Sequence, residues 1–417
     1  MSNRARSATV AAAVLAAVAA YTPSAAAQAD SAFAVSASGA SLMRLNTDAS
    51  FVVRGTADEQ AEVYSGNVAA TGAGVRMLWI PQAWAFRAGK VDSFGANYWN
   101  PGSIGFGSAA FGENTRASGN HSFAAGLTTN ASGDEAVALG NSGTATGDRS
   151  FSFNGTASAV GAVAIGSGAQ ATNDDALAMG PSSIAGGLAS IVIGPSIANG
   201  NFGVAIGLQN SASGQFSVAI GKNARTANRQ GSVVLGDGCA GFSSDSVYPT
   251  ANNQFIARGC GGIKFFTSQN LSSGVQVAAG GGSWSSISDR NRKEHFLELD
   301  GEDVLSRLRN VPVSTWNYIA QEDSVRHMGP MAQDFSAAFG LGEDSLMINT
   351  VDIDGVNMAG VKALTTRTDA LRAENEQLRA QVAAQQAEIV RMRDEQAATA
   401  ARLERIEQAL RAAAPRP

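Results

Sequence analysis

Short runs in which apolar and small residues alternate recur along the middle of the chain, and each run closes on glycine. Three of these runs are AVALG (136–140), AVAIG (162–166) and SVAIG (217–221). The closing positions are about 14 residues apart, as expected for one short structural unit that is repeated. They are Gly112, Gly126, Gly140, Asn154, Gly166, Gly180, Gly194, Gly207, Gly221 and Gly236. Residues 103–238 are therefore predicted to form a repeat architecture.

Alternation within each run predicts a β-strand, because successive side chains of a strand point to opposite faces. Val137 and Leu139, for example, flank Ala138, so the large residues share one face and the small residues share the other. An alanine follows most closing positions after a short segment, and Gly or Asn comes soon after it, which suits tight turns. Each repeat is predicted to be one coil of a parallel β-roll, with strand, turn, strand and turn.

A single coil of this kind cannot bury its apolar face, whereas stacked coils bury it against their neighbours. We expect the small-residue faces to remain exposed on so thin a solenoid. Identical chains would pack through these faces and close a three-fold assembly.

The repeat pattern, AxAIGxxAxAxG, resembles the YadA-like heads of trimeric autotransporter adhesins. This resemblance implies a trimeric, left-handed, parallel β-roll that belongs to a surface fibre. Glycine-containing segments such as Gly166–Gly168 and Gly221–Lys222 are interpreted as structural, because neither has the spacing of a phosphate-binding loop that leads into a helix. No cofactor is predicted.

Towards the end of the chain the apolar positions follow a seven-residue pattern, and Ala, Glu, Gln and Arg fill most other positions. Such heptads predict a left-handed coiled coil over residues 361–411. Its two columns are Val361, Thr368, Asn375, Val382, Ile389, Gln396, Leu403 and Leu410, and Leu364, Leu371, Leu378, Gln385, Met392, Thr399 and Ile406. Polar residues within these columns weaken the seam, and the pattern alone suits a dimer as well as a trimer.

Three motifs follow one another before this helix, namely SDxxxK (288–293), STWNY (314–318) and RHMGPMAQDF (326–335). Together they resemble the endosialidase-type intramolecular chaperone family, which is also carried by phage tail spikes. The resemblance implies a small α+β domain, residues 288–360, that trimerises and helps the preceding β-structure to fold. It also implies that this domain then severs itself from the chain.

The same resemblance places the cut between Ile287 and Ser288, with Ser288 as the nucleophile and Lys293 as the general base. A serine hydroxyl is a weak nucleophile until a base takes its proton, and lysine does this only when uncharged. Because the reference pKa of lysine is about 10.4, such a base needs burial or nearby cations. Neighbouring arginines would favour the neutral amine, and neighbouring acidic residues would oppose it.

The spacing of this Ser–Lys dyad restricts how it can form, because residues five apart lie on opposite faces of a strand and on different sides of a helix. Ser288 and Lys293 can meet only if residues 289–292 turn or if Lys293 comes from a neighbouring subunit. If the dyad forms only when the chains trimerise, only correctly assembled chains would be cut. The alternative without chemistry is that Ser288 caps a following helix and Lys293 is solvated.

The chain has three histidines, which could take part in catalysis or bind a metal. His327 either assists catalysis or holds a turn beside Gly329 and Pro330 through a hydrogen bond. His121 and His295 lack partners at the spacing of metal ligands, so no metal site is predicted.

The regions on either side of the repeats are predicted to be a β-rich N-terminal cap, residues 28–102, and a β-connector, residues 239–287. The first contains an aromatic cluster that either packs as the end cap of a solenoid or offers a carbohydrate-binding surface. Its members are Trp79, Trp84, Phe86, Tyr98 and Trp99. The second contains Cys239 and Cys260, which either pair in an oxidising compartment or remain buried thiols.

The first 27 residues have the parts of an export signal: Arg4 and Arg6, an apolar stretch from Thr9 to Ala20, and small residues up to Ala27. About 12 apolar residues are too few for a membrane anchor, and no later stretch predicts a transmembrane helix. Net charge is −5 and no basic stripe is present, which excludes nucleic acid as a partner.

The sequence therefore predicts a mainly β, homotrimeric, exported protein that is extracellular or lies on a bacterial cell surface. Its β-roll would act as an adhesin-like fibre for a host or surface glycan or protein. The alternative function is a glycan-degrading, tail-spike-like fibre enzyme with the same chaperone. Without an interpretable pair of carboxylates, the sequence favours the adhesin over the glycosidase.

Overall fold

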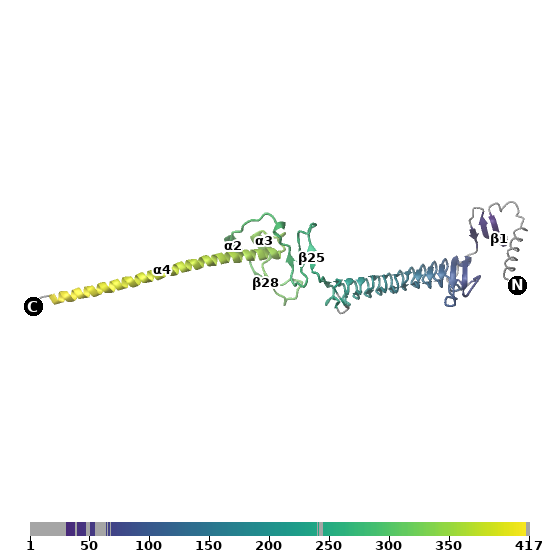
Figure 1. Cartoon of the computed structure of the whole chain (residues 1–417), viewed down its shortest axis with the longest axis horizontal. Coiled ribbons are helices and arrows are strands. Elements are labelled where there is room, and N and C mark those ends of the chain that lie inside the picture. Colours follow the sequence, from purple (N-terminus) through teal and green to yellow (C-terminus); the bar gives the residue numbers. More distant parts are fainter. Residues whose placement is uncertain are drawn as a thin grey trace. The chain divides into compact units, whose positions relative to one another are not determined.

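The computed structural model describes residues 31–37, 40–46, 51–54, 64, 66, 68–239, 241 and 245–413. The chain divides into two compact units, Met1–Gly262 and Ile263–Pro417. Figure 1 shows the stacked coils of the first unit in blue and teal, and the helices of the second unit in green and yellow. The predicted export signal, residues 1–27, lies outside the described residues.

The first unit contains a β-solenoid built from two sheets, and this confirms the predicted β-roll. One sheet takes a strand from every coil: β6 (Ala109–Glu113), β8 (Phe123–Leu127), β10 (Val137–Asn141), β12 (Phe151–Phe153), β14 (Val163–Ile165), β16 (Leu177–Met179), β18 (Ile191–Ile193), β20 (Val204–Leu208), β22 (Val218–Lys222) and β23 (Val233–Gly236). All of these strands are parallel and in register.

The second sheet of the roll consists of eight strands of two residues each. They are β7 (Arg116–Ala117), β9 (Asn130–Ala131), β11 (Thr144–Ala145), β13 (Thr156–Ala157), β15 (Gln170–Ala171), β17 (Ile184–Ala185), β19 (Ile197–Ala198) and β21 (Ser211–Ala212). Each contributes its alanine to the interior, where the alanine side chain is fully buried. The alanine that recurs in every coil is thus the packing residue of this sheet.

The interior of the roll is lined by the small residues of the longer strands as well. Ala138, Ala164 and Ala178 are fully buried, whereas the large residues that alternate with the interior ones face outward, with Phe153 42 % and Ile193 40 % exposed. The expectation that small-residue faces stay exposed was therefore wrong. Two strands of so few residues enclose a narrow space, which holds mostly alanine and serine with an occasional valine such as Val192, so the larger residues point out of a single chain.

The closing glycines are required by the stacking of the coils. Gly126 has φ +127°, a value that other residues rarely adopt, and a Cβ added there would lie 2.0 Å from the carbonyl oxygen of Gly140. Equivalent close approaches recur from coil to coil, for instance at Gly207 against Gly221. The glycines thus allow successive backbones to approach each other and carry no ligand role.

The roll's long sheet continues beyond residues 103–238 at both ends. At one end β5 (Ala85–Val91) pairs with β6, and β4 (Gly74–Ile80) pairs antiparallel with β5. At the other end β24 (Phe255–Ala257) pairs with β23. A separate antiparallel sheet, β1 (Ser31–Ala37), β2 (Ala40–Asn46) and β3 (Phe51–Val53), precedes the roll.

The N-terminal end of the roll is closed by a packed cap around Trp99. This side chain is fully buried, and its Nε1 donates to the carbonyl oxygen of Thr115 at 2.8 Å. Arg87, also fully buried, donates to the carbonyl oxygens of Ser108 and Ala117, and burial lowers its pKa to about 10. The aromatic cluster is therefore divided, because Trp99 is core while Trp79 remains 43 % exposed.

The second unit begins with an antiparallel sheet of β25 (Ile263–Phe266), β26 (Gly274–Val277) and β27 (Ser285–Ser286). A short 3-10 helix, η3 (Arg290–Arg292), follows it. Next come α2 (Gly301–Asn310), the hairpin of β28 (Ser314–Trp316) and β29 (His327–Gly329), and α3 (Ala332–Phe339). The unit thus places the segment that contains the predicted cut directly after a strand.

The last element is α4 (Thr350–Ala413), a helix of 64 residues. Its first turns pack on α2, where Gly360 faces Leu308 and Gly301 faces Ala363. Farther along, the heptad columns are open to solvent in a single chain, with Leu371 52 % and Leu403 58 % exposed. In the part of the chain that the structure describes, no helix combines the length and apolarity that crossing a membrane requires.

Candidate functional site

Ser288 and Lys293 lie in contact within one chain. Lys293 Nζ donates to Ser288 Oγ at 2.7 Å. The turn between them is η3, whose N-cap is Asp289, which accepts from the backbone N–H of Asn291 at 2.9 Å. Asp289, not Ser288, caps this turn, so the hydroxyl of Ser288 is not used for capping.

The residue before the predicted cut is held by the three-stranded sheet. Ser285 and Ser286 of β27 pair with Gln276 and Val275 of β26, and the backbone N–H of Ile287 donates to Gly274 O at 3.1 Å. The sheet ends there, and the chain enters the turn at Ser288. The peptide bond between Ile287 and Ser288 therefore lies where an extended, paired strand changes into a tight turn.

The residues after the predicted cut are held by two arginines. Arg292 Nη1 donates to Leu271 O at 2.7 Å, and its Nε lies 3.7 Å from Asp289 Oδ2. Arg290 stacks over Phe296, with 4.8 Å between the guanidinium carbon and the ring centroid. The first contact reaches the loop before β26 and the second stays beside the turn, and both lie within one chain.

Both members of the dyad are exposed in the single chain. A lysine in water is held charged, and a charged lysine cannot take a proton from serine. The single chain therefore brings the two side chains into contact at an exposed position.

His327 lies in a different part of the second unit, on β29. Its Nε2 is 2.8 Å from Gln321 Oε1, and its ring lies 4.9 Å from the ring of Trp316 and 5.6 Å from that of Tyr318. These contacts fasten the segment between β28 and β29, which fits the interpretation as a turn-holding residue. None of these contacts, all of them among the described residues, reaches Ser288 or Lys293.

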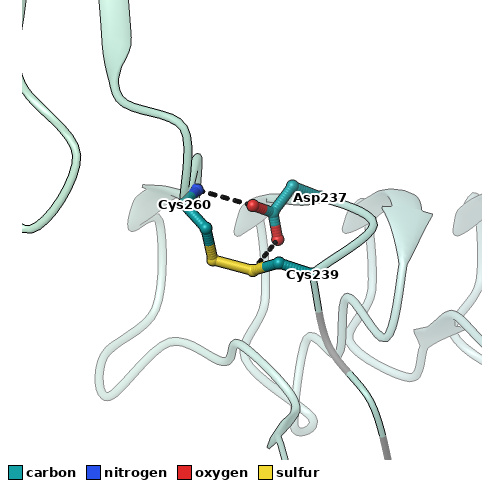
Figure 2. Close-up of side chains that lie close together, drawn as sticks. All are labelled: Asp237, Cys239 and Cys260. Carbon is teal, nitrogen blue, oxygen red and sulfur yellow. Dashed lines mark hydrogen bonds between the residues drawn. A yellow bond between two sulfur atoms is a disulfide. The ribbon is translucent and has the colours of Figure 1, made fainter.

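Cys239 and Cys260 form a disulfide at the last coil of the roll, which decides between the two alternatives of the sequence analysis. Figure 2 shows Asp237 beside this bond. Asp237 Oδ2 accepts from the backbone N–H of Cys260 at 2.6 Å, and Oδ1 accepts from Arg258 Nε at 2.8 Å. Chiefly the N–H of Cys260, and then Arg258, lower the pKa of Asp237, against the opposing effect of burial.

Asp237, Cys239 and Cys260 also offer three potential metal-ligand atoms within 4.8 Å of one another. In the oxidised protein both sulfurs are bonded to each other, so they carry no thiolate to bind a metal. Asp237 Oδ1 lies 3.0 Å from Cys239 Sγ, but a disulfide sulfur has no proton to donate. The group is thus a covalent clasp that joins the exit of β23 to the exit of β24.

The outward face of the long sheet forms an apolar stripe along the whole roll. Because the strands pair in register, the outward-facing residues of this sheet form two columns. One column runs from Trp79 on β4 to Phe255 on β24, and the other runs from Met77 on β4 to Ala257 on β24. Exposed members include Phe111, Phe123, Phe153, Met179, Ile191, Ile193 and Ile220. Continuous apolar surface of this kind marks an interaction face, because isolated soluble proteins rarely keep so much of it in water.

Together these features define a class of protein, namely one with a repeat-built β-solenoid followed by a small α/β region and a long C-terminal helix. Comparison with family models makes the class specific. Residues 103–127, 131–153, 157–183, 171–196 and 198–224 match the YadA head domain repeat. Residues 288–340 match the family described as chaperone of endosialidase. Both resemblances seen in the sequence are thus confirmed.

Both of these families are trimeric, and their combination is that of a trimeric adhesin-like fibre with a chaperone domain. No curated protein matches the chain. The match to the chaperone family includes Ser288 and Lys293 and ends at residue 340, before α4 begins.

Sequence reasoning named Arg292 only as a cation near Lys293 and missed its anchoring contact, and it missed Asp237 altogether. Arg292 contacts Leu271 through a backbone carbonyl, which every residue possesses, so no sequence signal could have identified the acceptor. Asp237 was also missed, although an acidic residue two positions before a cysteine in a turn is a signal that could have identified it.

Proposed function

We propose that this chain is an exported homotrimeric adhesin-like fibre whose C-terminal domain assists assembly and then cuts the chain between Ile287 and Ser288. The contact of Lys293 Nζ with Ser288 Oγ at 2.7 Å is the observation that carries this proposal. The fibre that remains would bind a glycan or protein on a host or other surface through its roll.

The proposed reaction begins when the neutral amine of Lys293 takes the proton of the Ser288 hydroxyl. Ser288 Oγ attacks the carbonyl carbon of Ile287, and the peptide C–N bond breaks while the lysine ammonium returns the proton to the leaving nitrogen. Ile287 is then an ester on Ser288 Oγ. Water hydrolyses this ester and leaves a carboxylate on Ile287 and both a free amine and a free hydroxyl on Ser288.

Assembly would supply the activation that the single chain lacks. Lys293 is exposed in one chain, and covering it with neighbouring subunits would remove water and favour the uncharged amine. The cut would then follow trimer formation and would not occur on unassembled chains. The reaction is a single turnover, because the nucleophile becomes the first residue of the released domain.

The trimer is supported by two exposed apolar surfaces. The stripe on the long sheet includes Ile193, which is 40 % exposed, and the seam of α4 includes Leu378, which is 50 % exposed. Two surfaces with different periodicities, one on a sheet and one on a helix, both need a partner. A second and third copy of the same chain satisfies both at once.

The test is the intact mass of the purified, assembled protein. We expect a fragment that ends at Ile287 and another that begins at Ser288. Ser288→Ala and Lys293→Ala should leave only the full-length chain, while the matched controls Ser306→Ala and Lys362→Ala are cut normally. Normal cutting of both dyad variants would reject the proposed dyad.

A further inference from the structure

We propose that Arg292 is a positioning residue for the cut, and that it works by fastening the turn of the dyad to the loop between β25 and β26. This role rests on the self-cleavage proposed above. Arg292 does not touch the reacting atoms. It acts through Lys293, the next residue along the chain, and through Asp289 at the start of the turn.

The acceptor that Arg292 uses is itself held firmly. Leu271, whose carbonyl oxygen accepts from Arg292 Nη1 at 2.7 Å, has a left-handed backbone with φ +57°. Its N–H donates to Ser268 O at 3.1 Å. Ser268 Oγ in turn accepts from the backbone N–H groups of Ser272 at 2.8 Å and Ser273 at 3.0 Å. The loop therefore presents a fixed carbonyl and not a mobile one.

This loop and the adjoining first residue of β26 hold the chain on both sides of the proposed cut. On the upstream side, Gly274 O accepts from Ile287 N at 3.1 Å. On the downstream side, Leu271 O accepts from Arg292. Among the residues that the structure describes, the Arg292–Leu271 bond is the one hydrogen bond that joins the two sides of the cut. The two acceptors that anchor the chain before and after the scissile peptide, Gly274 O and Leu271 O, are thus only three residues apart.

Such anchoring matters because a nucleophilic attack depends on a narrow range of distance and angle. The turn formed by η3 must hold Lys293 Nζ at Ser288 Oγ while Ser288 faces the carbonyl of Ile287. Asp289 organises the inside of the turn, and Arg292 bridges Asp289 to the loop. Without Arg292 the turn would still form, but its orientation towards the upstream strand would vary.

The experiment compares the rate of cutting in assembled trimers, followed by denaturing gels and intact mass from the moment of assembly. Arg292→Ala should slow the cut by about 10- to 100-fold, the cost of misplacing a reacting group by roughly 1 Å. Arg292→Lys keeps a donor for Leu271 O and should recover most of the rate. Arg309→Ala, the matched control at an exposed arginine of α2, should stay within about three-fold of the wild type.

A positioning role also predicts the pH dependence. Arg292→Ala also removes a cation next to Lys293, so the pH dependence is compared in Arg292→Lys, which keeps the charge and should leave the shape of the pH–rate profile unchanged. Equal cutting rates in Arg292→Ala and wild type would overturn the proposal, as would a displaced profile in Arg292→Lys. Native mass must show that the variant is trimeric, so that a loss of assembly is not taken for a loss of positioning.

If Arg292→Ala does not assemble, Ser268→Ala decides the question, because it loosens the same loop without touching the turn. Slower cutting in that variant supports the proposal, and unchanged cutting overturns it. Failure of the proposed function is distinguishable. A wild-type trimer that is never cut rejects the self-cleavage itself, whereas a wild type that is cut alongside an equally fast Arg292→Ala rejects the positioning role alone.

Discussion

Lys293 donates from its amine to the hydroxyl of Ser288 across a turn that is capped by Asp289, so one chain contains both members of the proposed dyad at 2.7 Å. Hydrogen bonding and base catalysis make different demands on this lysine. A charged lysine can hold the serine in place, but only an uncharged lysine can take its proton.

Lys293→Arg separates these two demands. The guanidinium of arginine can still donate to Ser288 Oγ, but it does not lose its proton in proteins. We therefore expect assembly to be kept and the cut to slow by about 10²- to 10⁴-fold, the usual contribution of a general base. Intact mass at successive times after assembly measures this, and a rate close to that of the wild type would show that Lys293 is not the base.

The seam of α4 allows a test of whether the cut depends on assembly. Leu371 and Leu378 lie in one heptad column and are both about half exposed in the single chain. Leu371→Asp combined with Leu378→Asp would place charges in the seam, so we expect chains whose α4 helices do not associate and which stay uncut. Gln377→Asp adds a charge outside both columns and should assemble and cut normally. Cutting at the wild-type rate in chains whose α4 helices do not associate would separate the chemistry from assembly of this domain.

The sequence predicted the repeated coils correctly but not which face of each strand is buried. The spacing of glycines such as Gly126 and Gly140 identified stacked coils, because each coil repeats the same close backbone approach. Alternation correctly separated large from small residues, but the assumption about which set is exposed failed. Ala138 fills the interior because the enclosed space is narrow, and that width is a property of the closed coil that no single strand encodes.

The sequence also predicted part of the candidate site, namely that a turn could bring Ser288 and Lys293 together, but not the contacts that anchor this turn. The spacing of Ser288 and Lys293 required either a turn over residues 289–292 or a second subunit, and the structure forms that turn within one chain. The anchoring of the turn was not predictable, because Arg292 binds a carbonyl of Leu271 that lies 21 residues earlier. Contacts between side chains and distant backbone leave no residue pattern to detect.

The apolar stripe on the long sheet predicts that the β-roll by itself associates through this face. Ile193 points out of the roll and is 40 % exposed, so Ile193→Asp should leave the coil intact and disrupt association between rolls. Arg149→Asp, on an exposed turn of the same roll, is the matched control and should associate normally. Analytical ultracentrifugation with circular dichroism measures both properties, and a trimeric Ile193→Asp head would place the interface elsewhere.

The disulfide between Cys239 and Cys260 closes a loop of 21 residues at the last coil. Cross-links of this length stabilise folded proteins by about 3 kcal/mol, if the effect comes from restricting the unfolded chain. We expect Cys239→Ser with Cys260→Ser to lower the free energy of opening the last coil by about that amount. Hydrogen exchange at Phe255–Ala257 should rise, while exchange at Val137–Asn141 stays unchanged. Equal protection of Phe255–Ala257 in both proteins would mean that β24 does not depend on the clasp.

Asp237 gives the same clasp a dependence on pH. Its pKa is lowered in the folded protein, first by the N–H of Cys260 and then by Arg258. A group whose folded-state pKa lies below its unfolded value, about 3.9 for aspartate, stabilises the fold above that value. This stabilisation is lost as the pH falls through the folded-state pKa.

The matched variant is Asp237→Asn, which removes the titrating group and keeps the size of the side chain. At pH 7 the oxidised wild type should unfold at a higher temperature than the variant, and the difference should begin to shrink below about pH 4 and fall further as the pH passes the folded-state pKa of Asp237. Other carboxylates affect both proteins alike and cancel in the difference. A difference that stays constant from neutral to strongly acidic pH would mean that the carboxylate charge of Asp237 does not hold the clasp.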